Sequence, residues 1–329
     1  MKNVKALALL SGGLDSTLAV KLLLEQRIEV EAINFVSPFC LCKRGGCGAS
    51  EVAKRFNIPL EIVTVGKDYL KVVKSPKFGY GKNMNPCIDC RIFMLKKAKK
   101  YARKTGASFI FTGEVLNERP MSQHFNAMKL IEEEAGLKGK ILRPLSAKVL
   151  PMTVMEKKGL VNRVKLMGIC GRSRKKQIEL AKKFSIVDYP CPAGGCLLTY
   201  KEFSNKLRDL FNHRRRISLQ EIALLKLGRH FRFGNDKIIV GRNEIENKTL
   251  LKMKQQSDYY FEVPDCGSPI TILQGPKTRK AIQKAATLTA YYSDKKEGDI
   301  LVKFGKENLH RSITVSIPNE KEVEELRII

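Results

Sequence analysis

The chain opens with a strand, glycine turn and helix pattern that then repeats. Residues 4–10 form a short apolar run, residues 11–16 read SGGLDS, and residues 17–25 carry apolar side chains at helical spacing. The alternation continues at residues 29–36, 49–56, 60–65, 91–105 and 108–112, and a last strand is expected within residues 141–150. Strands that alternate with helices favour parallel pairing, because each helix returns the chain to the same edge of the sheet. The sequence therefore predicts an α/β fold with a doubly wound parallel sheet.

A second, smaller α+β domain is expected in the last third of the chain. Residues 203–227 have helical spacing. Beyond residue 229, short apolar runs alternate with turn residues, and one helical pattern lies near residues 278–292. The predicted division is an α/β domain at residues 1–199, a helical linker at residues 200–228 and the smaller domain at residues 229–329.

Basic residues greatly outnumber acidic ones. The 61 Lys and Arg against 33 Asp and Glu give a net charge of +28, and the first 199 residues hold 36 basic and 16 acidic side chains. Such a surplus attracts polyanions and makes nucleic acid the expected partner, with a generally Lys-rich surface as the alternative. No apolar run reaches the about 20 residues that cross a bilayer, and no signal-peptide pattern is present, so we expect a cytoplasmic protein without a membrane partner.

The SGGLDS turn has the properties of a phosphate-binding loop. Glycines between a strand and a helix let backbone amides approach an anion without hindrance from Cβ atoms. No Gly-Lys-Ser/Thr follows, so the turn is not a Walker A loop. Serine hydroxyls can donate to phosphate oxygens, and Asp15 can hold Mg²⁺. The candidate nucleotide-binding residues are Ser11, Gly12, Gly13, Leu14, Asp15 and Ser16.

Paired cysteines indicate metal or redox chemistry, because disulfides are rare in a reducing compartment. Cys87 and Cys90 form a CxxC just before the helix expected at residues 91–105, a spacing at which two thiolates share one metal or cluster. Half of a structural zinc site is the alternative for this pair. Cys191 and Cys196 follow about a hundred residues later.

The other cysteines are weaker candidates. Cys170 lies in a basic turn, GICGRSRKK. Cys40, Cys42 and Cys47 form a second group, for which the sequence leaves open both a second metal site and a loop of reduced thiols.

Several segments resemble known families. SGGLDS matches the PP-loop of ATP pyrophosphatases, which cleave ATP between its α and β phosphates. The TGE at residues 112–114, the SQ at residues 122–123 and the LRPL at residues 142–145 are similar to segments of ThiI-type tRNA 4-thiouridine synthases, over about residues 1–200. This resemblance implies that Gly113 lets the backbone approach the nucleotide and that Glu114 orients substrate or metal. An exposed carboxylate at a strand end is the alternative for Glu114.

The same resemblance implies a way of carrying sulfur. PP-loop tRNA thiolases hold a 4Fe-4S cluster by three cysteines and leave one iron open for sulfide. The resemblance implies this role for Cys87, Cys90 and Cys196, with Cys191 as the reserve choice for the third cysteine and Asp15 as a further catalytic residue. A metal-free route stays open, in which a persulfide on Cys196 is resolved by Cys87 or Cys90. The sequence shows neither the N-terminal RNA-binding domain nor the rhodanese domain of ThiI-type enzymes, which favours sulfide over a persulfide as the donor.

Residues 229–306 resemble the NFACT-R RNA-binding domain, with GRN at residues 241–243 and AYYS at residues 290–293. Tyr259, Tyr260, Tyr291 and Tyr292 either stack on bases or belong to the core, and the core is the expectation for at least half of them. The candidate RNA-binding residues are Lys96, Lys100, Arg103, Arg172, Arg174, Lys175, Arg242, Asn243 and Lys252.

These patterns together predict a tRNA sulfurtransferase that uses ATP to adenylate a uridine carbonyl and replaces its oxygen with sulfur. The expected product is 4-thiouridine rather than 2-thiouridine. A persulfide-dependent thiolase and a non-catalytic, ATP-sensing RNA-binding protein of quality control are the alternatives. The sequence is compatible with a homodimer. The prediction requires that Cys87, Cys90 and Cys196 lie near one another and near the SGGLDS turn.

Overall fold

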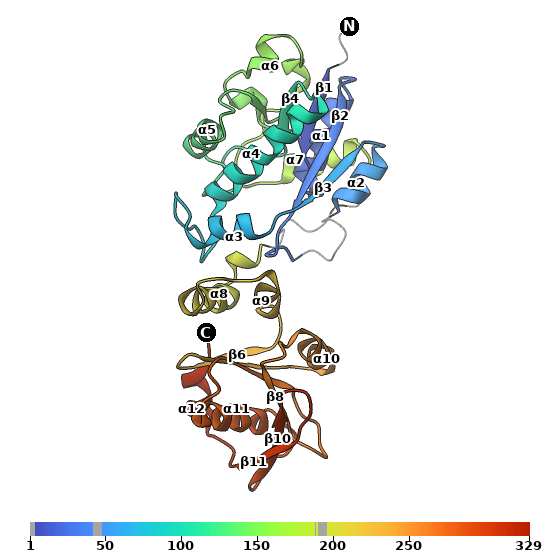
Figure 1. The fold of residues 1–329 in the computed structure, drawn as a ribbon. Helices are drawn as coiled ribbons and strands as arrows, with labels where there is room; N and C mark the ends of the chain where they lie inside the picture. Colours follow the sequence, from blue (N-terminus) through green and yellow to red (C-terminus); the bar gives the residue numbers. More distant parts are fainter. Residues whose placement is uncertain (1–3, 42–47, 188, 190–195) are drawn as a thin grey trace. The chain divides into compact units, whose positions relative to one another are not determined.

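The chain forms two compact units, Met1–Thr199 and Tyr200–Ile329. This computed structural model describes residues 4–41, 48–187, 189 and 196–329 (Figure 1). The first unit contains a parallel sheet between helices and the second an antiparallel sheet with helices, so the predicted fold class is confirmed. Among the described residues, every helix is too short or too polar to span a bilayer.

The sheet of the first unit has five strands in the order β3-β2-β1-β4-β5, and every neighbouring pair is parallel. Its strands are β1 (Lys5–Leu9), β2 (Glu29–Val36), β3 (Leu60–Thr64), β4 (Phe109–Thr112) and β5 (Ile141–Leu142). The α-helices of this unit are α1 (Leu14–Leu24), α2 (Ala49–Arg55), α3 (Lys67–Lys74), α4 (Cys87–Thr105), α5 (Phe125–Glu134), α6 (Val154–Lys157) and α7 (Lys175–Lys183).

Alternating side chains of the central strands fill two cores, one on each face of the sheet. Ala6 and Ala8 of β1 pack in the cluster that includes residues of α1, α2 and α7. Leu7, between them, packs with residues of α4 and α5 in the other cluster. Strands covered on both faces are typical of parallel sheets, and Figure 1 shows α4 and α1 on opposite sides of the sheet.

The topology itself indicates where a ligand binds. β1 lies between β2 and β4, and the chain moves outward in one direction through β2 and β3 and in the other through β4 and β5. Ligands of open parallel sheets bind where the strand order reverses, beyond the carboxyl ends of the strands. At that point β1 leads into the SGGLDS turn and β4 into Gly113, and Leu9 is paired with Thr112.

Two details of the first unit differ from the sequence predictions. The basic helix begins at Cys87, so the CxxC forms its first turn and does not precede it. Pro86 occupies the N-cap position, where the missing amide proton is not needed by the helix. The expected strand within residues 141–150 is reduced to two residues and is followed by a short 3₁₀ helix, Ala147–Val149.

The second unit contains a six-stranded sheet in the order β11-β10-β8-β9-β7-β6, in which all pairs are antiparallel. Its strands are β6 (Arg229–Phe233), β7 (Asp236–Val240), β8 (Tyr259–Glu262), β9 (Thr271–Gln274), β10 (Ile300–Gly305) and β11 (Arg311–Val315). Its helices are α8 (Lys201–His213), α9 (Leu219–Leu224), α10 (Glu244–Met253), α11 (Arg279–Tyr291) and α12 (Glu320–Leu326).

Both faces of β7 are buried. Ile238 and Val240 pack in the cluster that includes α11, whereas Ile239 packs with Leu224 of α9 and Leu250 of α10. The helix predicted over residues 203–227 is two helices, α8 and α9. Ser218 starts α9 with a capping box, accepting from the Glu221 amide while the Glu221 carboxylate accepts from the Ser218 amide, which favours a new helix over continuation of α8.

Candidate active site

The SGGLDS turn presents the N-terminus of α1 at the sheet switch point. Gly12 has φ of +79°, which favours glycine, and Gly13 is the N-cap of α1 with no side-chain cap. The Ser16 hydroxyl donates to the Gly13 carbonyl at 2.9 Å and lies 3.1 Å from the Ser11 hydroxyl. The uncapped amides and the helix dipole favour an anion at this turn.

Asp15 lies in this turn with an incompletely satisfied carboxylate. Its Oδ2 is 3.5 Å from Nη2 of Arg174, whereas its Oδ1 is buried and has no hydrogen-bond partner among the described residues. Burial raises the pKa of Asp15, and the charges of Arg174 and Arg119 oppose this shift. Glu118 is a second carboxyl nearby, and its pKa is raised by burial and by the charge of Asp15. A buried carboxylate oxygen without a donor suits a magnesium ion.

Gly113 lies directly against the start of α1. A Cβ atom at this residue would be 2.5 Å from the Asp15 carbonyl carbon and 2.5 Å from Ser16 Cα. Only glycine therefore allows the end of β4 to pass this close to the phosphate loop. The approach couples the segment after β4 to the position of Asp15 and Ser16.

Cys87 and Cys90 occupy the first turn of α4, beside Tyr69 of α3. The Tyr69 side chain is buried, and its hydroxyl donates to Cys90 Sγ at 3.0 Å. Between the two cysteines, the Asp89 carboxylate accepts from the amides of Lys77 and Phe78, at 2.8 and 3.1 Å. Asp89 thus fixes the loop ahead of α4.

Long-range backbone contacts bring Cys196 to the same place. The Met84 amide donates to the Leu198 carbonyl at 3.1 Å, and the Leu197 amide donates to the Phe39 carbonyl at 2.9 Å. Cys40 and Cys196 form an isolated antiparallel bridge. The structure therefore places Cys40 beside Cys196. Cys42, Cys47 and Cys191 lie outside the described residues, and Cys170 is exposed and bridges to Leu116.

The thiols of Cys87, Cys90 and Cys196 have raised pKa values. Burial raises the pKa of Cys196 to about 12, and negative charge on Cys90, Cys87 and Cys40 contributes to the rise. Burial also raises the pKa of Cys87 and of Cys90, while the positive charge of Arg91 acts in the opposite direction on both. Thiols with raised pKa values hold their protons until a metal or a strong positive charge displaces them.

Arginine side chains connect the thiols to the phosphate loop. Burial raises the pKa of both Asp15 and Cys87, and the charge of Arg119 opposes the rise at each, so Arg119 lies within electrostatic reach of both groups. The Gln123 side chain accepts from the Arg119 amide at 3.1 Å and thereby shapes the loop that carries it. Arg119 is thus a basic residue that acts on both the phosphate loop and the CxxC.

Glu114 forms a second connection and is not an exposed carboxylate, which was the alternative for it. Its side chain is 4% exposed and pairs with Arg91 at 3.3 Å and with Arg143 at 3.0 Å. Burial alone would raise the pKa of Glu114, but the two guanidinium groups outweigh it and hold the pKa below its ordinary value. Gly113 contacts α1 and Glu114 holds Arg91 of α4, so two successive residues fix both halves of the site.

The described thiols are not arranged as the ligands of a single metal ion. Within the described ranges, no three His, Cys, Asp or Glu side chains are grouped as ligands of one metal ion. A 4Fe-4S cluster separates its thiolate ligands more widely, because each binds a different iron. Cys87, Cys90, Cys196 and Cys40 are the described thiols of this site that are candidates for such ligands.

The candidate RNA-binding residues have different surroundings. Exposed side chains are those of Lys96, Lys100 and Arg103 on α4, Arg172 and Lys175 near the start of α7, and Lys252 on α10. Arg174 is at the phosphate loop, beside Asp15. Arg242 is paired with Glu246, and Asn243 caps α10 by accepting from the Glu246 amide at 3.0 Å. Those last two residues therefore have structural roles in the second unit.

Four residues that contact the site but lie in other segments of the chain were not identified from the sequence. Tyr69, Arg91, Arg119 and Arg143 belong to no metal or nucleotide pattern, and only the fold brings them to the thiols or the loop. For Arg143, one indication of a role was present in the sequence, because this residue belongs to the LRPL segment that resembles ThiI-type enzymes.

Comparison with known proteins agrees with this geometry. The family model described as thiamine biosynthesis protein (ThiI) matches residues 2–185, more than half of the chain. The chain belongs to the ThiI family. A second model, NFACT protein RNA binding domain, matches residues 228–327. Both predicted resemblances, to ThiI-type proteins and to NFACT-R, are confirmed.

Individual relatives align with this ThiI-family chain over shorter segments. A probable tRNA sulfurtransferase of Thermoanaerobacter sp. (strain X514) is 32% identical over 35% of this chain and 30% of its own length. A tRNA-specific 2-thiouridylase MnmA of Syntrophotalea carbinolica is 31% identical over 34% of this chain and 35% of its own length. The chain thus matches about a third of the length of these relatives.

One solved structure is similar to part of the ThiI-family chain. It is a 4-thiouridine synthetase in complex with RNA and bound ATP, with 24% sequence identity and a TM-score of 0.35. The alignment covers 56% of this chain and 52% of that one.

Proposed function

We propose that the protein is an ATP-dependent tRNA sulfurtransferase, which activates a uridine carbonyl and replaces its oxygen with sulfur. The observation that carries this proposal is a chain of contacts between the SGGLDS turn and the cysteine site. Gly113 lies against the turn, and Glu114 pairs with Arg91 of the helix that carries the CxxC. The charge of Arg119 also acts on both Asp15 and Cys87. The aligned relatives, a tRNA sulfurtransferase and a tRNA thiouridylase, act in the same class of reaction by name.

In the first half-reaction the phosphate loop binds ATP. The amides at the start of α1 and the hydroxyls of Ser11 and Ser16 receive the phosphates, and Asp15 holds Mg²⁺ through its unpaired Oδ1. Arg174 has a buried Nε without a partner among the described residues, and it offsets phosphate charge beside Asp15. The uridine oxygen attacks the α-phosphate, the bond to pyrophosphate breaks, and the base becomes adenylated.

In the second half-reaction sulfur displaces AMP from the adenylated carbon. We assign Cys87, Cys90 and Cys196 as the ligands of a 4Fe-4S cluster, which when bound would present sulfide on an open iron. Tyr69 and Arg91 hold the Cys90 region in place and favour negative charge on sulfur. The net change is that one sulfide enters the base, and AMP and pyrophosphate leave.

The persulfide route is the second candidate. In that route Cys196 carries the persulfide sulfur, and Cys87 or Cys90 resolves it by forming a disulfide. Anaerobic purification separates the two routes, because a brown protein with broad visible absorbance supports a cluster and a colourless active protein supports a persulfide.

The target base is tested by nucleoside mass spectrometry. We propose that the product is 4-thiouridine and not 2-thiouridine. The basic surface of α4 and the second unit bind the tRNA. We also propose that the enzyme is cytoplasmic. tRNA from a deletion strain should lack one thiolated uridine, and the purified protein with ATP, Mg²⁺, sulfide and that tRNA should restore it with release of pyrophosphate. RNA binding without pyrophosphate release would instead support the ATP-sensing alternative.

A further inference from the structure

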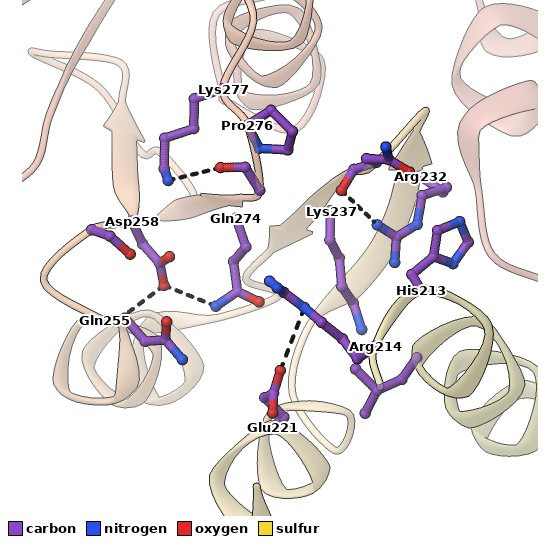
Figure 2. Close-up of a pocket in the computed structure, with 14 residues that line it drawn as sticks. His213, Arg214, Glu221, Arg232, Lys237, Gln255, Asp258, Gln274, Pro276 and Lys277 are labelled. Atoms are coloured by element: carbon purple, nitrogen blue, oxygen red, sulfur yellow. Dashed lines mark hydrogen bonds and ion pairs between the residues drawn. The ribbon is translucent and has the colours of Figure 1, made fainter. Parts of the chain in front are cut away.

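The second unit contains a polar cavity of about 430 Å³, shown in Figure 2. Its wall is built by the end of α8, by α9, by strands β6, β7 and β9, and by the loops before β8 and after β9. The volume falls within the range of about 300–1,000 Å³ that is typical of small-molecule sites. Only Leu210 and Pro276 contribute apolar side chains to the wall, so a polar ligand fits it best.

Lys237 is the side chain in this cavity that lacks a partner. It lies on β7, is 6% exposed, and reaches into the space between Gln274 and Arg232 (Figure 2). Within the described part of the chain, no hydrogen bond or ion pair joins its ammonium group to another residue. An ammonium group with little access to water and no partner is costly, and a bound anion would offset that cost.

The other charged groups of the wall are already engaged. Arg232 donates to both carboxylate oxygens of Asp209, at 2.9 and 2.6 Å. Arg214 lies 3.7 Å from Glu221. Asp258 accepts from the side-chain amide of Gln274 at 2.8 Å. These pairs leave Lys237 as the buried positive charge available to a ligand.

Lys277 adds a second positive charge at the cavity. Its Nζ donates to the Gly275 carbonyl at 2.9 Å, and no carboxylate is paired with it among the described residues. The amide of Lys277 is held by the Asp236 carboxylate at 2.6 Å, so the loop that carries it is fixed to β7. Two lysines facing one polar cavity give it an excess of positive charge.

We propose that this cavity binds a phosphate group of a nucleotide, with Lys237 as the principal charge partner and Lys277 as the second. Lysine binds phosphate as a point charge, and the amides of Gln274 and Gln255 can bond to sugar or base. Both lysines lie within residues 228–327, the part that matches an RNA-binding domain, which favours RNA as the source of the phosphate. The proposal does not depend on ATP binding or sulfur transfer in the first unit.

The titration of Lys237 should make ligand binding at this cavity depend on pH. Burial lowers the pKa of Lys237 to about 8, with Asp209 and Glu221 raising it and Arg232 and Lys206 lowering it further. His213, Arg214, Asp258 and Lys277 are the other charged or titratable groups of the wall. A bound phosphate would raise the pKa of Lys237, so binding takes up a proton and weakens as the pH rises above about 8.

The test uses the full chain and the variant Lys237→Met, which keeps the side-chain volume and removes the charge. Lys280→Met removes a charge from an exposed position of the same unit and is the matched control. Binding of single-stranded oligouridylate and of uridine monophosphate is measured by calorimetry at pH 7.5 and pH 9, with circular dichroism to verify folding. We expect Lys237→Met to weaken binding at least about tenfold and to abolish its pH dependence, as for loss of a charged hydrogen bond.

The two ligands identify the source of the phosphate. Weaker oligouridylate binding alone assigns the site to polymeric RNA, whereas weaker binding of both ligands assigns it to a single nucleotide. Unchanged binding of both ligands in folded Lys237→Met overturns the proposal. Lys277→Ala, at a partly exposed position, provides a second variant, and equal affinity of this variant and the wild-type protein for both ligands would also count against the site. ATP binding at the phosphate loop should be the same in all variants.

Discussion

Gly113, at the end of β4, lies against the backbone of Ser16, in the first turn of α1. We expect Gly113→Ala to push the phosphate loop away from β4 or to destabilise the first unit by at least about 1–3 kcal/mol, as overpacking does. Thermal unfolding and ATP binding by calorimetry would measure the two effects.

Gly13→Ala is the matched comparison for this change. A Cβ at residue 13 would meet only the Ser11 hydroxyl, at an ordinary 3.5 Å, so this variant should fold like the wild-type protein. It should still bind ATP more weakly, because the methyl group lies where the phosphates approach. Equal stability of the Gly113 and Gly13 variants would argue against a close approach of β4 to the phosphate loop.

Serine substitutions should separate the cysteines of the sulfur site from the other cysteines by their effect on tRNA thiolation. Serine at Cys87, Cys90 or Cys196 should reduce tRNA thiolation to background and leave ATP binding within about twofold, because these thiols act after nucleotide binding. Cys170→Ser is the control, since Cys170 is exposed and has an amide of Asn117 as its neighbour, at 3.6 Å. Thiolated nucleosides in purified tRNA, measured by mass spectrometry, give the result.

Cys40→Ser separates two explanations of the bridge to Cys196. If Cys40 is part of the sulfur site, this variant should lose activity by about 10- to 100-fold, as expected for a group that supports ligands. Activity equal to that of Cys170→Ser would show that the bridge only shapes the chain.

Exposed basic residues of α4 should bind the RNA backbone. Glutamate at Lys96, Lys100 or Arg103 should weaken tRNA binding and reduce the dependence of log affinity on log salt by about 1 for each phosphate that the variant no longer binds. Lys158→Glu, an exposed lysine just after α6, is the control for net charge. Filter binding at several salt concentrations would reveal the slopes, and identical slopes for all variants would contradict this role of α4.

The doubly wound sheet was predictable because its signals are local. The apolar runs and the glycine turn at residues 11–16 lie within short windows, and strand–helix alternation fixes the topology class. The helix that starts at Cys87 was placed too late, because Pro86 and the polar segment before it gave no helical periodicity. The two-helix arrangement of α8 and α9 depends on one capping box, which the broader spacing concealed.

The site was less predictable, because its supports come from distant parts of the chain. Sequence spacing pairs Cys87 with Cys90, but it contains nothing that brings Tyr69 to Cys90 or Cys40 to Cys196. Glu114 was expected to face substrate or solvent, whereas it is buried between two arginines from other segments. Such contacts follow from packing, which one sequence does not display.

Glu114→Gln tests whether this carboxylate is structural. The change leaves Arg143, itself 4% exposed at its side chain, without one of its charge partners, and we expect a loss of about 3–5 kcal/mol in the free energy of unfolding. The pKa of Glu114 is lowered in the folded state, so its contribution is present above the unfolded pKa and is lost as the pH falls through the folded value. Urea unfolding at pH 7 and pH 4 measures both effects. A stable but inactive Glu114→Gln would instead support a direct role in the reaction.

The buried Lys237 should make the second unit more stable at alkaline pH. Its pKa falls from 10.5 in the unfolded chain to about 8 in the folded one, so the unfolded state binds more protons between these values. The free energy of unfolding should therefore rise by roughly 3 kcal/mol over that window, and Lys237→Met should remove the rise and be more stable than the wild-type protein at pH 7. Urea unfolding followed by circular dichroism at pH 7.5, 9 and 10.5 measures the difference between the two proteins, with Lys280→Met as the control. A difference that is constant across this range would mean that the Lys237 ammonium is solvated or paired in the folded protein, and the cavity would then have no unpaired charge to offer a phosphate.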